Sequence, residues 1–286
     1  MKKLIAVFMA SLMCISLAAC GSKGEEPTEA PAQTEAPADS EEPAEAEGAE
    51  APEDNGEAAG DFTTVTEGVL TMGTNATFPP YEFYDGEEIV GIDAEIAGLL
   101  AEKLGLTLEI QDMDFTAIVT SVQTGKIDVG LAGMTVTEER LENVNFTNTY
   151  ANGIQVVIVK EDSDIQSIDD LEGKLIGVQE GTTGHTFCAD DYGEDSVVAC
   201  TNGATAVQSL LTDKVDCVVI DKQPAISFVE ANEGLKILDT EYANEDYAAA
   251  VSKDNDALLN ALNTALDELI ADGSIQAILD KYIKAE

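Results

Sequence analysis

The sequence is poor in positive charge and in several residue types on which catalysis and metal binding depend. Its 286 residues contain 14 Lys and Arg against 56 Asp and Glu, with one His and no Trp. Nucleic-acid backbones are bound through Lys and Arg, so a net charge of −42 argues against nucleic acid as a partner. A single His, His185, leaves no two-His metal site and no evident Ser-His pair. We therefore expect no metal, no cofactor and no enzymatic activity.

Long hydrophobic runs are also absent, except for one at the N-terminus. Lys2 and Lys3 precede the apolar stretch 4–19, which is the pattern of a secretory signal peptide. The stretch runs into Leu-Ala-Ala-Cys, which resembles a bacterial lipobox and ends at Cys20; an ordinary signal peptide with an incidental Cys is the alternative. We expect residues 1–20 to be a lipoprotein signal, Cys20 to carry the lipid, and the protein to be extracytoplasmic and anchored to the cell membrane.

The next segment lacks the residues that build a core. Residues 21–60 contain no Val, Ile, Leu, Phe or Tyr, but 13 acidic residues and five of the eight Pro. Such a composition cannot bury enough apolar surface to fold, so residues 21–61 are predicted to be a disordered, self-repelling linker. A tether of this kind would hold the following domain close to a membrane partner. A cell-wall spacer without a specific partner is the alternative.

Cysteine is scarce in the remaining part, for which we predict a folded domain over residues 62–286. Its three Cys cannot all pair internally, and none has the C-x-x-C spacing of a zinc or redox site. Cys217 belongs to an apolar run and is predicted to be a core residue. A bridge between Cys188 and Cys200 is one arrangement that an extracytoplasmic location would allow.

The hydrophobic pattern of this domain predicts an α/β fold. Unbroken apolar runs, typical of strands buried on both faces, occur at residues 156–159, 175–178, 197–199 and 218–220. Between and after them, apolar residues recur at helical spacing over 92–104 and 258–269. Strands that alternate with helices indicate a mixed α/β architecture.

A weak internal repeat suggests two similar α/β units. Residues 118–128 align with residues 206–216 at a constant offset of 88, and both segments have the pattern of a helix, a turn and a strand. The same offset places Gly133 opposite Asp221. Two such units would form two lobes with a cleft between them; chance similarity of a common unit is the alternative. Because ligands bind at the carboxyl ends of strands in such sheets, the segments that follow the strands are the candidate binding segments.

Arg140 stands out among these segments because it is the only Arg in the chain. Its planar guanidinium can bind a carboxylate through two parallel hydrogen bonds, which Lys cannot do. If Thr137 caps the helix that follows, Arg140 occupies the third helical position and its side chain leans back toward the loop at Thr135. A surface ion pair with a neighbouring acid is the alternative.

The other candidate residues are weaker signals when each is taken alone. The loop 181–184, Gly-Thr-Thr-Gly, would present backbone N–H groups to an anion at a helix N-terminus, although it is not a nucleotide-binding fingerprint. Asp221 could cap a helix rather than bind a ligand. Phe78 and Phe115 could be core residues rather than ligand platforms.

Taken in order, four segments resemble the polar amino-acid-binding proteins of bacterial ABC transporters: residues 73–83, 90–93, 132–140 and 178–183. The resemblance covers about residues 66–283. It implies a two-lobed fold of the periplasmic-binding-protein type (type II), whose lobes are joined by two crossover strands, here near 153–159 and 246–252. The first lobe would then comprise residues 62–153 and 248–286, and the second residues 154–247.

The resemblance also implies a set of ligand-binding residues. Arg140, with backbone N–H groups of Thr135 and Thr183, would bind the α-carboxylate of a free amino acid. The α-ammonium would meet the Gly133 carbonyl, the Thr135 hydroxyl and the Asp221 carboxylate. The complete expected set is Asn75, Phe78, Phe115, Ala132, Gly133, Thr135, Arg140, Gln179, Thr182, Thr183 and Asp221. Phe78 and Phe115 would sandwich the ligand side chain, whose pocket Asn75, Gln179 and Thr182 would line.

The chemistry of that side-chain pocket leads to an expected ligand. Relatives that take Arg, Lys or His usually have an acid at the position of Asn75, whereas Asn75 and Gln179 offer only amides. We therefore expect an uncharged polar amino acid, similar to glutamine in size. A basic amino acid is the alternative. The net charge of −32 on residues 61–286 favours it, because a negative domain attracts cationic ligands toward its cleft.

The expected role is that of the substrate-binding lipoprotein of an ABC importer. We expect a monomer whose partners are the free amino acid and the permease and ATPase subunits of the importer. A ligand-sensing domain and a dehydratase-like enzyme on the same fold are less favoured alternatives. The first would need a transmembrane segment and a signalling module, which we do not expect after the C-terminal amphipathic pattern, and no acid–base pair for catalysis is evident in the sequence.

Overall fold

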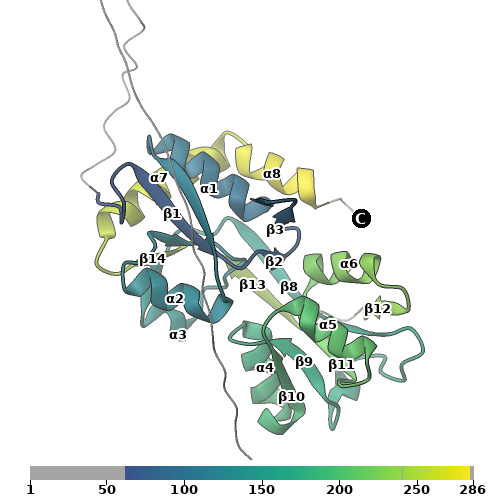
Figure 1. Cartoon of the computed structure of the whole chain (residues 1–286). Helices are drawn as coiled ribbons and strands as arrows, with labels where there is room; N and C mark the ends of the chain where they lie inside the picture. The colour runs from purple at the N-terminus through teal and green to yellow at the C-terminus, as the bar shows by residue number, and fades with distance from the viewer. Residues whose placement is uncertain (1–61, 240, 284–286) are drawn as a thin grey trace, which may run out of the picture. The chain divides into compact units, whose positions relative to one another are not determined.

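The computed structural model describes residues 62–239 and 241–283 (Figure 1). The predicted signal peptide, the lipid-attachment residue Cys20 and the predicted linker over 21–61 lie outside the described residues. All helices and strands named below belong to the domain that follows the predicted linker.

A five-stranded sheet forms the centre of the first lobe, in the order β5-β1-β6-β14-β7. Strand β1 pairs in parallel with β5 and β6, and β14 pairs antiparallel with β6 and β7. The bounds are β1 Val69–Thr74, β5 Thr107–Asp112, β6 Val129–Gly130, β7 Val144–Phe146 and β14 Ala250–Ser252. A separate antiparallel sheet joins β2 Thr77–Phe78, β3 Glu82–Asp85 and β4 Glu88–Val90.

Helices cover both faces of the five-stranded sheet. Helices α1 (Ile92–Lys103), α7 (Asp256–Ala271) and α8 (Ser274–Tyr282) pack together on the face to which β1 turns Leu70 and Met72. Helix α2 (Phe115–Gln123) packs on the opposite face. The helical spacing read from the sequence is confirmed, because α1 and α7 both bury their apolar stripe.

A six-stranded sheet forms the centre of the second lobe, in the order β10-β9-β11-β8-β12, with β13 also paired to β8. Helix α4 packs on one face of this sheet, and α5 and α6 pack on the other. The strands are β8 Ala151–Lys160, β9 Ile176–Gln179, β10 Val197–Cys200, β11 Cys217–Asp221, β12 Leu235–Ile237 and β13 Ala243–Tyr247. The helices are α4 Thr183–Tyr192, α5 Gly203–Leu211 and α6 Lys222–Ala231, with short 3-10 turns η1 Ile168–Leu171 and η2 Glu194–Ser196.

Two antiparallel strands join the lobes. The chain leaves the first sheet after Phe146 and enters the second as β8, and it returns from β13 to β14 across residues 248–249. Strands β8 and β13 pair with each other from Ala151 to Gln155 (Figure 1). This is the two-lobed, type II arrangement with two crossover strands that the sequence predicted. The residue boundaries assigned to each lobe stay a prediction.

The internal repeat corresponds to one structural unit in each lobe. In both copies a helix (α2 or α5) turns into a strand (β6 or β11) through a residue with positive φ, which is Gly125 (φ 67°) in one and Asp213 (φ 59°) in the other. The last aligned acid also has the same role in both copies. Asp128 accepts the N–H of Thr71, and Asp216 accepts the N–H of Leu175.

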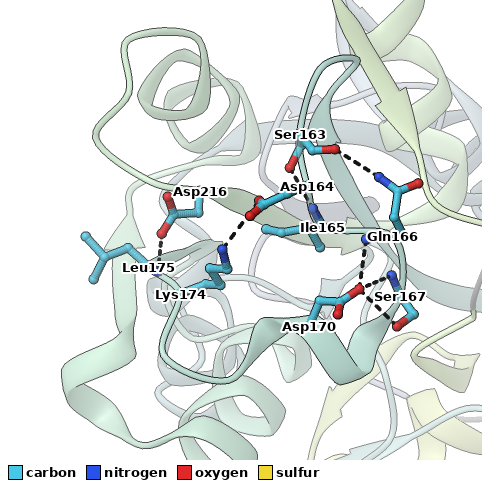
Figure 2. A network of polar contacts seen from close by, with 9 residues as sticks. All are labelled: Ser163, Asp164, Ile165, Gln166, Ser167, Asp170, Lys174, Leu175 and Asp216. Atoms are coloured by element: carbon cyan, nitrogen blue, oxygen red, sulfur yellow. Dashed lines mark hydrogen bonds and ion pairs between the residues drawn. The ribbon is translucent and has the colours of Figure 1, made fainter.

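The loop from β8 to β9 is held by short-range polar contacts (Figure 2). Asp170 accepts the N–H groups of Gln166 and Ser167, both at 3.0 Å, which closes a capping box at η1. These hydrogen bonds hold the pKa of Asp170 below its usual range. Lys174 pairs with Asp164 at 3.4 Å. The network stabilises the loop without contributing to the pocket described below.

The three described cysteines are free and buried, so the bridge between Cys188 and Cys200 is not formed in this structure. Cys217 is a core residue of β11, as expected. Burial raises the pKa of both Cys188 and Cys217 to about 12, which keeps these thiols protonated and unreactive. Among residues 62–239 and 241–283, no helix has the length and apolar character needed to cross a membrane.

Candidate functional site

One pocket is lined by residues from both lobes. All eleven residues expected to bind a ligand line it, together with Glu82, which the sequence analysis did not single out. The lining residues are Asn75, Phe78, Glu82, Phe115, Ala132, Gly133, Thr135, Arg140, Gln179, Thr182, Thr183 and Asp221. Ligand contact by each of them stays a prediction.

Arg140 reaches the pocket from the short helix α3 (Glu138–Leu141). The Thr137 hydroxyl accepts the Arg140 N–H at 3.2 Å, so the predicted N-cap is confirmed. The side chain turns back as expected: Nη1 donates to the Thr135 carbonyl at 2.7 Å, and the guanidinium lies 5.3 Å from the centre of the Phe115 ring. Burial lowers the pKa of Arg140, but the ordinary pKa of an arginine is so high that the side chain stays charged. The site therefore contains a fixed, oriented cation.

The aromatic residues and the two amides occupy defined positions around the pocket. Phe78, on β2, is 8% exposed and Phe115, at the start of α2, is 9% exposed, so both line the pocket from the first lobe. The Gln179 Nε2 group donates to Asn75 Oδ1 at 3.0 Å, which links the end of β9 to the segment after β1. The Asn75 Nδ2 group donates to the Met113 carbonyl at 3.0 Å, so the network fixes the Asn75 amide orientation.

The loop 181–184 lies at the N-terminus of helix α4, as its sequence suggested. Thr182 is the N-cap, and its hydroxyl accepts the His185 N–H at 3.3 Å while donating to the Gln179 carbonyl at 2.8 Å. Thr183, the first helical residue, is 6% exposed. A helix N-terminus with free N–H groups at a pocket favours a negatively charged group. This end of the pocket and the Arg140 guanidinium together favour a carboxylate.

Asp221 has a different environment from that of a helix cap. It precedes α6, but its side chain makes no cap hydrogen bond. Instead it accepts from the Tyr247 hydroxyl and, at 2.8 Å, from Gln155 Nε2, so both crossover strands hold it. Burial, and then the neighbouring carboxylate of Glu245, raise the pKa of Asp221 well above its ordinary value. A cation bound next to Asp221 would stabilise its ionised form.

Glu82 is the pocket residue that the sequence analysis missed. It lies on β3, is completely buried, and has no hydrogen-bond partner on either carboxylate oxygen among the described residues. Its signal in the sequence was an acid placed between Tyr81 and Phe83 in an otherwise apolar stretch. Such an acid is rarely buried without a reason, since burial of an unpaired carboxyl group is costly.

Asp93, at the start of α1, lies next to Glu82 and holds the Gly133 loop. Its Oδ2 atom accepts the Gly133 N–H at 2.7 Å and the Tyr150 hydroxyl at 2.9 Å, whereas Oδ1 has no partner among the described residues. Burial raises the pKa of Asp93 to about 6, against these two hydrogen bonds and a smaller contribution from Glu82, which lower it. Gly133 has φ 52°, and a Cβ there would meet the Phe78 ring, so the loop requires glycine.

The pocket thus has one end suited to an anion and another suited to a cation (the anion-binding end and the cation-binding end). Arg140 and the α4 N-terminus form the first, and Asp221 with the nearby Gly133 loop forms the second. A zwitterion with both charges on one carbon matches this pair of ends. The described residues contain no group of three or more His, Cys, Asp and Glu that could hold a metal ion.

Comparison with known proteins identifies the class. Residues 70–285 match the bacterial extracellular solute-binding proteins, family 3. The arginine-binding extracellular protein ArtP of Bacillus subtilis (strain 168) is 34% identical over 226 residues, which cover 76% of this chain and 87% of ArtP. An ancestral arginine-binding protein superposes with a TM-score of 0.73 in its glutamine-bound structure (39% identity; 77% of this chain and 100% of that one). The arginine-bound structure of an ancestral arginine-binding protein superposes with a TM-score of 0.71 (41% identity; 76% of this chain and 98% of that one).

The chain therefore belongs to family 3 of the bacterial extracellular solute-binding proteins, the amino-acid-binding proteins of ABC transporters. It is a binding protein and not an enzyme. Its place of action is outside the cytoplasmic membrane, as for the family.

Proposed function

We propose that this protein captures a free amino acid with a cationic side chain, arginine-like, and delivers it to an ABC permease. The observation that carries this choice is the balance of buried charge at the pocket. Arg140 is its only cation, whereas Asp221 and the adjacent carboxyl groups of Glu82 and Asp93 are acidic. Even with one proton on Glu82, the acids outnumber the cation, so a ligand with a net positive charge gives the better complement.

Relatives support the same choice, since ArtP and the ancestral protein are both named as arginine-binding. The uncharged, glutamine-like ligand expected from the sequence is thus the less supported of the two. That expectation counted only the amides of Asn75 and Gln179 as side-chain partners, and it omitted the buried acids next to the pocket. The glutamine-bound ancestral structure keeps glutamine as the second candidate.

Within the pocket, the α-carboxylate would bind Arg140 and the N–H groups at Thr135 and Thr183. The α-ammonium would bind Asp221, the Thr135 hydroxyl and the Gly133 carbonyl. Because Arg140 belongs to the first lobe and Asp221 to the second, a zwitterion would link the lobes, and binding would favour their closure. We further propose that Cys20 carries the lipid anchor and that the protein acts as a monomer.

A thermal-shift panel of the twenty amino acids and cystine tests the choice of ligand. At a hundredfold its Kd, a ligand adds about 2.7 kcal/mol of stability. For a domain of this size, that stabilisation raises Tm by roughly 5–10 °C. We expect arginine, and then lysine, to give the largest shifts. Shifts with glutamine and none with arginine or lysine would reverse the choice, and no shift with any amino acid would contradict the proposed function.

A further inference from the structure

Glu82 is a pocket residue with an unmet hydrogen-bonding requirement. Its side chain is fully buried and lines the pocket, and neither Oε1 nor Oε2 has a donor among the described residues. A buried carboxylate without a cation or donors costs several kcal/mol. The group must therefore be neutral, or be supplied with donors by whatever occupies the pocket.

The surroundings of Glu82 favour the neutral form. The titratable groups that act on it are Asp93 at the start of α1, Tyr81 beside it in the chain, Tyr150 just before β8, and Asp221 at the end of β11. None of these is a cation. Burial first, and then Asp93, raise the pKa of Glu82 well above its ordinary value.

A proton on Glu82 resolves two unmet requirements together. The carboxyl group of Asp93 is next to that of Glu82, and its Oδ1 atom has no donor among the described residues. A protonated Glu82 can donate to this atom, and adjacent buried carboxyl groups commonly share a proton in this way. One oxygen of Glu82 then remains without a partner. Tyr150 donates to Asp93 and Tyr247 donates to Asp221, and no described hydroxyl, that of Tyr81 included, donates to either oxygen of Glu82.

We propose that Glu82 is a further ligand-binding residue, which acts as a neutral carboxyl group: it donates to Asp93 Oδ1 and accepts a hydrogen bond from an N–H group of the bound amino acid. The proposal rests on the amino-acid-binding function proposed above. It extends the cation-binding end of the pocket beyond Asp221. Since Asp93 also accepts the Gly133 N–H, the ligand, Glu82 and Asp93 form one chain of hydrogen bonds that ends at the Gly133 loop.

Two substitutions separate a neutral from a charged role. In Glu82→Gln, the amide can donate to Asp93 and its carbonyl can accept from the ligand, so the variant reproduces the protonated acid. In Glu82→Leu, neither bond can form. By isothermal titration with L-arginine and L-glutamine at neutral pH, we expect Glu82→Gln to stay within about threefold of the wild-type Kd and Glu82→Leu to weaken it about 10- to 100-fold. Circular dichroism checks that both variants fold.

Asp128→Asn provides the matched control. Asp128 is a buried acid of the same lobe whose two oxygens accept the backbone N–H groups of Val65 and Thr71, and it does not line the pocket. Ligand affinity should be unchanged in this variant. Infrared difference spectra add a readout that a purely structural role would not move. The C=O band of a protonated carboxylic acid should shift when ligand binds to the wild type, and should be missing in Glu82→Gln.

The outcomes are distinguishable. Equal weakening of ligand binding in Glu82→Gln and Glu82→Leu would mean that the charge of Glu82 is needed. Wild-type affinity in Glu82→Leu would mean that Glu82 does not contact the ligand. Either result overturns this proposal while the proposed binding of arginine stands. If Glu82→Leu does not fold, Glu82→Gln and the infrared band decide alone, and a ligand-independent or missing acid band overturns the proposal. A wild-type protein that binds no amino acid overturns the proposed function as well.

Discussion

The Nη2 group of Arg140 donates a hydrogen bond to the carbonyl of Gly181 at 3.1 Å, and this bond joins the first lobe to the second. The Nη1 group of the same guanidinium donates to the Thr135 carbonyl within its own lobe. One side chain therefore connects the loop after β6 with the turn before α4. A ligand carboxylate at Arg140 would add to a contact that already links the lobes.

Replacement of Arg140 should remove ligand binding and keep the fold. We expect Arg140→Ala to lower affinity about 10²–10³-fold, because loss of one partner from a desolvated charged pair costs roughly 2–5 kcal/mol. Arg140→Lys keeps the charge but not the planar pair of donors, and should fall between the wild type and Arg140→Ala. Calorimetry measures both. Near-normal affinity in Arg140→Ala would show that the carboxylate binds elsewhere.

A methyl group on the first crossover strand should disturb the acid at the cation-binding end. A Cβ on Gly153 would overlap the hydroxyl of Tyr247, which donates to Asp221. We expect Gly153→Ala to lower the free energy of unfolding by about 1–3 kcal/mol and to weaken ligand binding.

Gly98→Ala is the control for this substitution, since Gly98 lies in α1 and a Cβ there meets nothing within 4 Å. It should raise stability by about 0.5–1 kcal/mol through helix propensity. Chemical denaturation measures both variants. Equal stability of Gly153→Ala and Gly98→Ala would argue that β8 and β13 tolerate a shift of Tyr247.

The ligand-free protein should lose stability as pH rises through the acidic range. The pKa of Asp93 is raised by burial from 3.8 to about 6, so the folded state holds this proton where the unfolded state has released it. The resulting stabilisation is fully present below 3.8 and is lost as pH rises through 6. The difference between these two pKa values corresponds to about 3 kcal/mol.

Denaturation of the wild type and of Asp93→Asn between pH 4 and pH 8 isolates this contribution from the general effect of the acidic surface. The stability of the variant should depend less on pH than that of the wild type. Identical slopes for the two proteins would exclude Asp93 as the source.

Cys20→Ala should release the protein from membranes, because Cys20 is the predicted lipid attachment site. Fractionation of cells that express the wild type or the variant, followed by immunoblotting, measures the distribution. A Cys14→Ala variant, within the predicted signal peptide, serves as the control and should stay membrane-bound after processing. Membrane retention of processed Cys20→Ala would contradict lipid anchoring at this residue.

Much of the pocket could be predicted from sequence because its residues follow strands, and strand ends converge in α/β sheets. Arg140, Gly133 and Asp221 were found in this way, and the offset of 88 that relates Gly133 to Asp221 reflects the same helix–turn–strand unit in each lobe. The N-cap at Thr137 and the turn before α4 depend on a few neighbouring residues, so local chemistry was sufficient to predict them.

The sequence by itself thus determined the α/β class, the strand-end residues and the single arginine at the anion-binding end. Only the tertiary structure decided the partners of the buried acids. Glu82 and Asp93 are 11 positions apart and belong to different elements, and Asp221 takes its hydrogen bonds from β8 and β13 rather than from the helix it precedes. The protonation state of an acid depends on burial and on every charge near it in space, and sequence spacing does not encode those distances.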